Sequence, residues 1–342
     1  MQRTTARIDT AFRATTRLID RGVAIVDRRQ LDAAVEREAL VAGLLGKPAT
    51  IAPKYFYDAT GCALFCRICK QPEYYPTRTE AAIFDLERQG IVTAIGTGKQ
   101  FVDLGAGDCA KGEAWLRSLR PRAYVAVDIA AAALEQALPA IAHANAGIDV
   151  RGVLTDFTRG LDVASDIDEG PTTFFYPGSS IGNFAPADAL GFLREIARHC
   201  SRDAGSGLLI GADTKKDPAR LAAAYDDAAG VTAAFNRNIL RNVNRILGTR
   251  FQVDRFAHVA IYNQAASRIE MHLEAIDTQS VTIDGIARIF SAGERIHTES
   301  SYKYSPPEFI AILERAGFAR IRVWQDAAGD FAVYYASNAA IA

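Results

Sequence analysis

A glycine-rich turn is the first place in this 342-residue chain where residue types and spacing point to chemistry. The apolar run 101–104 predicts a buried strand, and the glycines Gly105 and Gly107 behind it allow a tight turn that a ligand can approach closely. A second predicted strand, 123–127, ends in Asp128, at the distance where an acidic residue meets ribose hydroxyls. The pattern predicts a nucleoside-bearing cofactor, and it leaves nicotinamide, flavin and S-adenosylmethionine (SAM) open.

The next two predicted strands also end in residues suited to a ligand. Asp156 and Phe157 follow the strand 149–154, where a carboxylate and an aromatic ring could hold an adenine by hydrogen bonding and stacking. The segment 174–184 lies at the end of the following strand, at the edge where substrates meet cofactors. Asn183 in this segment could bind a substrate or could only cap the next helix.

Further candidates lie on elements that come later in the chain. Tyr225 and Thr232 are seven residues apart in a predicted helix, 217–235, so both side chains lie on one face and can point into one cavity. Glu299 and Ser301 share one face of a predicted strand. A core tyrosine with a single hydrogen bond and a solvated strand face are the alternative explanations of these two patterns.

Metal and hydrolase chemistry find no support in the sequence. Cys62, Cys66 and Cys69 have a spacing that could suggest an iron–sulfur cluster, but the apolar residues between them favour the buried face of a short helix. The five histidines are scattered without a zinc-binding spacing, so we expect no metal. Neither the Gly-x-Ser-x-Gly turn of hydrolases nor the phosphate-binding loop of nucleotide triphosphatases occurs.

The composition is that of an ordinary globular protein. Apolar residues make up 49% and charged residues 23% of the chain, and the net charge is -1, so nothing attracts nucleic acid or an anionic membrane. No apolar run approaches the length of a membrane span or of a secretory signal. The five scattered cysteines do not form a disulfide framework, so we expect a cytoplasmic protein. We also expect a monomer without nucleic-acid or membrane partners.

Strands and helices alternate through the middle of the chain. Strands are predicted at 101–104, 123–127, 149–154, 172–176 and 207–212, and helices at 110–120, 130–142, 185–199 and 217–235. This alternation predicts an α/β fold with a doubly wound, mostly parallel sheet that binds ligands at its carboxyl edge. After about residue 236, alternating apolar residues predict antiparallel strands instead.

The change of pattern predicts two domains. The cofactor domain comprises residues 79–213 and 304–342. The smaller, α+β substrate-binding domain is discontinuous and comprises residues 1–78 and 214–303. Its first part, 1–50, carries helical periodicity.

Six motifs in a fixed order resemble those of the L-histidine Nα-methyltransferase family of the ergothioneine pathway. They are YFYD at 55–58, PEYYPTRTE at 72–80, DLGAG at 103–107, GSSIGNF at 178–184, AYDD at 224–227 and ESSYK at 299–303. The resemblance implies a Rossmann-like, class I SAM-dependent methyltransferase domain and a substrate domain. It covers nearly all of the chain from residue 54 onward.

The resemblance also implies roles for individual residues. SAM would be held by Gly105, Gly107, Lys111, Asp128, Asp156 and Phe157. The carboxylate or amine of the amino acid would be held by Asn183 and Tyr225, and the α-amine would be lined by Tyr57, Phe65, Gly178 and Thr232. The imidazole would contact Tyr74, Glu299 and Ser301, with Met271 against the ring. Cys62 and Asp103 depart from the family pattern, which usually has Ser and Glu there, and neither change removes a contact to histidine.

The implied reaction is three successive methyl transfers from SAM to the α-amine of L-histidine, which give the betaine hercynine. Tyr57 is the candidate catalytic residue, which would position the amine directly or through water. Methylation of another amino acid or amine is the alternative within the same class. A nicotinamide-dependent oxidoreductase and a catalytically silent amino-acid-binding protein are the alternatives from other classes.

Overall fold

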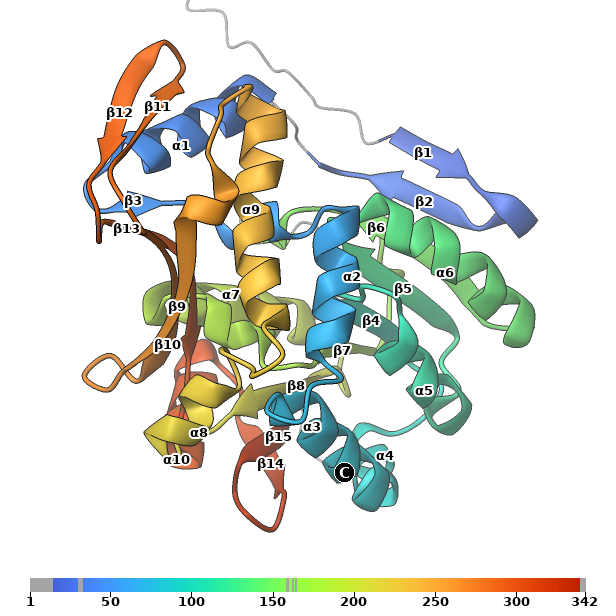
Figure 1. Ribbon diagram of the computed structural model, residues 1–342. Coiled ribbons are helices and arrows are strands. Elements are labelled where there is room, and N and C mark those ends of the chain that lie inside the picture. The colour runs from blue at the N-terminus through green and yellow to red at the C-terminus, as the bar shows by residue number, and fades with distance from the viewer. Residues whose placement is uncertain (1–14, 30–32, 158–159, 162, 164, 339–342) are drawn as a thin grey trace, which may run out of the picture.

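The computed structural model describes residues 15–29, 33–157, 160, 161, 163 and 165–338 (Figure 1). Its largest element is a nine-stranded sheet. In spatial order its strands are β1 (Thr15–Leu18), β2 (Ala24–Asp27), β6 (Asp149–Leu154), β5 (Ala123–Asp128), β4 (Gln100–Leu104), β7 (Thr172–Tyr176), β8 (Gly207–Asp213), β15 (Phe331–Ser337) and β14 (Arg320–Gln325). The six strands from β2 to β8 in this order pair in parallel, which confirms the predicted doubly wound α/β fold.

Helices cover both faces of this sheet, because successive residues of a strand point to opposite sides. Phe101 of β4 packs on one side with α3 (Tyr75–Leu86), α4 (Arg88–Ile95), α5 (Ala110–Leu119) and α6 (Ala131–Ala144). Its neighbour Val102 packs on the other side with α7 (Pro186–Cys200) and α10 (Pro306–Ala316). The parallel strands end at one edge between these layers, and the loops after β4, β5, β6 and β7 meet there.

A second, smaller unit has its own sheet and its own core. The sheet order is β3 (Ala49–Thr50), β13 (Arg295–Tyr302), β10 (Arg268–Ala275) and β9 (Phe256–Asn263), and a separate hairpin pairs β11 (Gln279–Ile283) with β12 (Ile286–Phe290). Its helices are α1 (Ala33–Leu45), α2 (Ala59–Ile68), α8 (Pro218–Ala223) and α9 (Val231–Leu247). Figure 1 shows α2 and α9 side by side, in contact along their lengths. Short 3-10 helices complete the fold: η1 (Asp20–Gly22), η2 (Pro53–Phe56), η4 (Ser180–Asn183) and η5 (Val253–Arg255).

The predicted helix 217–235 is wrong, because the chain breaks it into α8 and α9. Between them Gly230 has a φ of 69°, and the Asp227 carboxylate accepts hydrogen bonds from the backbone N–H groups of Val231 and Thr232 at 2.8 and 2.7 Å. These bonds satisfy donors that a new helix leaves unpaired, so α9 starts here. Tyr225 and Thr232 therefore do not lie two turns apart on one helix.

The amino-terminal region also differs from its predicted pattern. Residues 15–27 form β1 and β2 rather than a helix, and β2 pairs in parallel with β6 of the large sheet. These residues therefore join the sheet of the cofactor domain, whereas the prediction placed them in the substrate domain. The remainder of the predicted domain division stays a prediction, and its ends at 1–14 and 339–342 lie outside the described residues.

The part of the chain that the structure describes contains no helix with the length and apolar character needed to cross a bilayer.

Candidate active site

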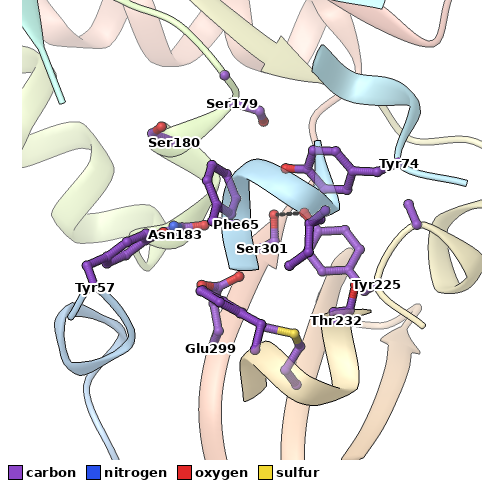
Figure 2. Close-up of a pocket in the computed structure, with 15 residues that line it drawn as sticks. Tyr57, Phe65, Tyr74, Ser179, Ser180, Asn183, Tyr225, Thr232, Glu299 and Ser301 are labelled. Atoms are coloured by element: carbon purple, nitrogen blue, oxygen red, sulfur yellow. Dashed lines mark hydrogen bonds between the residues drawn. The ribbon is translucent and has the colours of Figure 1, made fainter. Parts of the chain in front are cut away.

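A cavity of about 540 Å³, including its open mouth, lies where the smaller sheet meets the turn after β7 (Figure 2). Its walls come from segments that are far apart in the sequence. All ten predicted substrate residues line it: Tyr57, Phe65, Tyr74, Gly178, Asn183, Tyr225, Thr232, Met271, Glu299 and Ser301. The structure thus brings these side chains together, while their individual roles remain predictions.

The smaller sheet supplies one wall of the cavity. Glu299 and Ser301 alternate along β13, so both point to the same face, and Met271 of β10 lies opposite Glu299 in the strand register. All three side chains are buried, and Figure 2 shows both polar groups pointing into the cavity. The alternative of a solvated polar strand face is therefore wrong.

Glu299 supplies a buried carboxyl group to the cavity. Burial raises the pKa of its carboxyl group to about 7, and the nearby Lys303 ammonium opposes that rise only in part. Burial and the Lys303 charge act on this carboxylate, and no hydrogen bond from the described residues contributes to its pKa. A buried carboxylate that lines a cavity is suited to accept a hydrogen bond from an N–H of a ligand.

An aromatic wall faces the sheet. The rings of Phe65 and Tyr74 lie 6.3 Å apart, edge to face, and Tyr74 in turn lies 6.3 Å from Tyr225. Tyr57, which ends η2, lies 6.1 Å from both Phe65 and Phe235. Such edge-to-face contacts hold the rings in fixed positions.

Tyr57 stays a neutral phenol in this wall. Burial, followed by the negative charge of Glu299, raises its pKa well above 10. Tyr57 can therefore act as a hydrogen-bond partner of an amine, and it does not serve as an ionised base near neutral pH.

The turn after β7 forms the third wall. Gly178 has a φ of 79°, which a side chain would disfavour, and its backbone N–H donates to Glu80 at 2.7 Å. Glu80 is buried in α3 and also pairs with Lys111 at 2.6 Å. Lys111 was predicted to contact SAM, and this ion pair places it between the glycine turn and the cavity. Asn183 is exposed at the end of η4. It does not cap α7, whose N-cap residue is Ala185.

The remaining predicted cofactor residues gather at the carboxyl edge of the large sheet. Gly105 and Gly107 have φ values of 70° and 54° in the turn after β4. The Asp128 carboxylate accepts from the N–H of Gly107 at 2.8 Å, so it closes this turn from the end of β5. Phe157 lies over Gly105, since a side chain there would come 3.7 Å from its ring. The open backbone of the turn, with an aromatic ring above it, fits a nucleoside.

Asp156 lies beside this turn and reaches the other unit of the protein. Its carboxylate pairs with Lys54 at 3.3 Å, and Lys54 also pairs with Glu36 of α1. The segment that carries Tyr57 is thereby connected to the cofactor edge.

Several residues around the cavity were not predicted. They are Glu80, Asp213, Lys303, Ile68, Ser179, Ser180, Ala224 and Phe235. Two signals in the sequence could have found the charged ones. Asp213 ends a parallel strand at the carboxyl edge, and Lys303 continues the alternation of Glu299 and Ser301 on one strand face.

No group of three or more His, Cys, Asp or Glu side chains in the described ranges is arranged to hold a metal ion. Cys62, Cys66 and Cys69 lie along α2 as free thiols, and Cys66 is exposed.

Comparisons with known proteins identify the family of this chain. The family described as "Histidine-specific methyltransferase, SAM-dependent" matches residues 36–338. The histidine N-alpha-methyltransferases of Mycolicibacterium smegmatis and Mycobacterium tuberculosis are 41% and 40% identical to this chain, each over 88% of it and 94% of the relative. Ergothioneine biosynthesis protein 1 of Neurospora crassa is 28% identical over 81% of this chain and 32% of its own length.

Among solved structures, a SAM-dependent methyltransferase from Clostridium acetobutylicum superposes with a TM-score of 0.45 at 10% identity, over 81% of this chain and 98% of that one. The family match and the two mycobacterial relatives span nearly the whole described chain, both units included. The chain belongs to the family of histidine-specific, SAM-dependent methyltransferases, with a Rossmann-like class I fold.

Proposed function

We propose that this enzyme transfers three methyl groups in succession from SAM to the α-amine of L-histidine and releases hercynine. The observation that carries the proposal is the cavity itself, where a buried carboxylate and a buried hydroxyl, those of Glu299 and Ser301, lie together with aromatic rings. A ring with polar atoms at two edges satisfies both groups. Substrates without such atoms would leave them unpaired, and sites of this kind discriminate strongly.

SAM supplies an electrophilic methyl group on a sulfonium, which is already a good leaving group. The glycine turn, Asp128, Asp156 and Phe157 would hold SAM at the carboxyl edge. The protein's own task is to bind the neutral amine and align its lone pair with the methyl group. Tyr57 would position the amine, and Asn183 would hold the carboxylate from the opposite wall.

Mass spectrometry of L-histidine incubated with the enzyme and SAM tests the proposal. We expect products heavier by one, two and three methyl groups, with the third accumulating. Replacement of histidine by other amino acids or amines should give slow or no methylation. Efficient methylation of a different amine, with histidine unchanged, would overturn the substrate assignment.

The Glu299→Ala variant provides a second test of the assignment. Loss of the buried acceptor should raise KM for histidine at least tenfold, because an N–H of the ring would then lack a partner. We also propose a cytoplasmic location and a monomeric state, which cell fractionation and light scattering can check.

A further inference from the structure

Lys303 has the least exposed charge near the cavity. It follows β13 directly, and its side chain is 0% exposed, as is that of Asp213. Each hydrogen of its ammonium group has a partner in the protein. The ammonium lies 2.9 Å from the Asp213 carboxylate, and it donates to the hydroxyl oxygens of Tyr225 and Ser301, each at 2.9 Å.

The ion pair keeps Lys303 charged. Burial alone would lower its pKa, but Asp213 and the Tyr225 hydroxyl hold the pKa above its ordinary value. Asp213 also accepts from Lys216 at 2.5 Å and from the Tyr75 hydroxyl at 2.9 Å. Burial alone would raise the pKa of this carboxyl, but the Lys303 and Lys216 ammonium groups hold it below its ordinary value. An ammonium is a donor without any acceptor, so both hydroxyls must accept from it.

The direction of the bond between Tyr225 and Ser301 then decides what Ser301 can offer a ligand. A hydroxyl has two acceptor positions and one hydrogen. The Ser301 oxygen accepts from Lys303 and also from the Tyr225 hydroxyl at 2.8 Å, the bond drawn in Figure 2, so both acceptor positions are occupied. The Tyr225 hydrogen is used in that bond. Ser301 keeps one hydrogen and has nothing else to offer a ligand in the cavity.

We propose that Lys303 is a positioning residue that makes Ser301 a hydrogen-bond donor toward the substrate. The cavity then pairs one donor, Ser301, with one acceptor, the Glu299 carboxylate, both on the same face of β13. This pair selects a neutral ring with one N–H and one unprotonated nitrogen. The inference rests on the proposed function, since neutral histidine has such a ring, whereas an imidazolium ring has two N–H groups.

Two pyrrolylalanines test this selection. The pyrrol-2-yl and pyrrol-3-yl analogues of histidine each keep one ring N–H and replace the other nitrogen by C–H. In the natural enzyme we expect kcat/KM for histidine to exceed that for either analogue about 100-fold or more, because the Ser301 hydrogen is left unpaired. In Lys303→Met the hydroxyls of Tyr225 and Ser301 can reorient, and the preference should fall to about tenfold.

Lys216→Met is the matched control. It removes the other lysine from Asp213, and Lys216 makes no hydrogen bond to Tyr225 or Ser301 within the described residues. The proposal predicts that this variant keeps the natural preference for histidine. An equal loss of preference in the two variants, or an unchanged preference in Lys303→Met, would overturn it.

Binding of histidine and both analogues, measured by calorimetry with S-adenosylhomocysteine present, separates the two proposals. Histidine that binds with the expected preference and is never methylated would contradict the proposed function alone. Histidine that does not bind would contradict both. If Lys303→Met does not fold, the double variant Asp213→Asn/Lys303→Met, compared with Asp213→Asn, gives the same comparison without a buried carboxylate that has lost one of its two lysine partners.

Discussion

The burial of Glu299 lowers the stability of the folded protein at neutral pH and also suits this carboxylate to recognise a ligand. The residue is 8% exposed, and burial raises the pKa of its carboxyl group to about 7. The same burial makes any hydrogen bond that it accepts from a ligand stronger than one in water. Discrimination between substrates therefore depends on a hydrogen-bond acceptor whose desolvation already lowers the stability of the protein before substrate binds.

At Tyr57 we expect an effect on rate. Tyr57→Phe removes the phenol oxygen and keeps the ring that packs on Phe65 and Phe235. If the phenol positions the amine, kcat should fall about fivefold or more for each methyl transfer, since one hydrogen bond contributes about 1 kcal/mol or more. Single-turnover assays of histidine and its methylated intermediates measure this. Unchanged rates in all three steps would remove Tyr57 from the mechanism, and an unchanged melting temperature would show that the ring still packs.

The contact between η4 and β13 connects the two units at the cavity. Gly182 of η4 lies so close to β13 that a side chain there would come 2.7 Å from the carbonyl oxygen of Tyr302 and 3.3 Å from the Ser301 hydroxyl. Its neighbour Asn183 and the facing Ser301 both line the cavity. The width of the cavity is therefore set by the absence of a side chain at this glycine.

Gly182→Ala should push these two elements apart. We expect KM for histidine to rise about tenfold and the free energy of unfolding to fall by about 1–3 kcal/mol, because the new methyl group meets backbone. Gly191→Ala is the control: Gly191 lies in α7 with open space around it, so Ala should stabilise the helix by about 0.5–1 kcal/mol and leave KM unchanged. Similar KM values in the two variants would contradict this account of the contact.

At the scale of the molecule, three apolar cores surround the site. One core lies on each face of the large sheet. The third fills the smaller unit between its sheet and the helices α1, α2 and α9. The cavity lies where these units meet, and charged pairs cross the junction, among them Lys54 with Asp156 and Lys303 with Asp213. The site is thus assembled by the packing of the units rather than by either sheet alone.

The free energy of unfolding of the protein should depend on pH through the titration of Glu299. Its folded pKa of about 7 lies above its ordinary value of 4.5, so its contribution to stability is complete below pH 4.5 and is lost as the pH rises through 7. Glu299→Gln does not titrate. The unfolding free energy of the variant relative to the natural protein should therefore increase between pH 5 and pH 8, by up to about 3 kcal/mol.

Urea unfolding at both pH values measures this difference. Glu314→Gln, which replaces an exposed carboxylate on α10, is the control and should show no such change. A constant difference between Glu299→Gln and the natural protein across this range would show that the buried carboxyl does not titrate near pH 7.

Local patterns were sufficient for most elements. The five predicted parallel strands and the helices α5, α6 and α7 match the structure within one or two residues, because buried strands and amphipathic helices have distinct apolar periods. β12 was missed although Asp284 and Gly285, both with positive φ, form the kind of two-residue turn that joins a hairpin. β1 and β2 were missed because their place depends on pairing with β6, far away in the chain.

By itself the sequence determined most strands and helices of the large sheet, the glycine turn and ten of the residues that line the cavity. These follow from short-range patterns of apolar residues and from motifs that can be recognised in the sequence without knowledge of the fold. Only the tertiary structure decided which polar groups bind one another. Glu80 accepts from the Gly178 N–H and pairs with Lys111. Lys303 pairs with Asp213 and donates to the hydroxyls of Tyr225 and Ser301. The direction of a hydrogen bond depends on every partner of both atoms, and those partners come from strands and helices that only folding brings together.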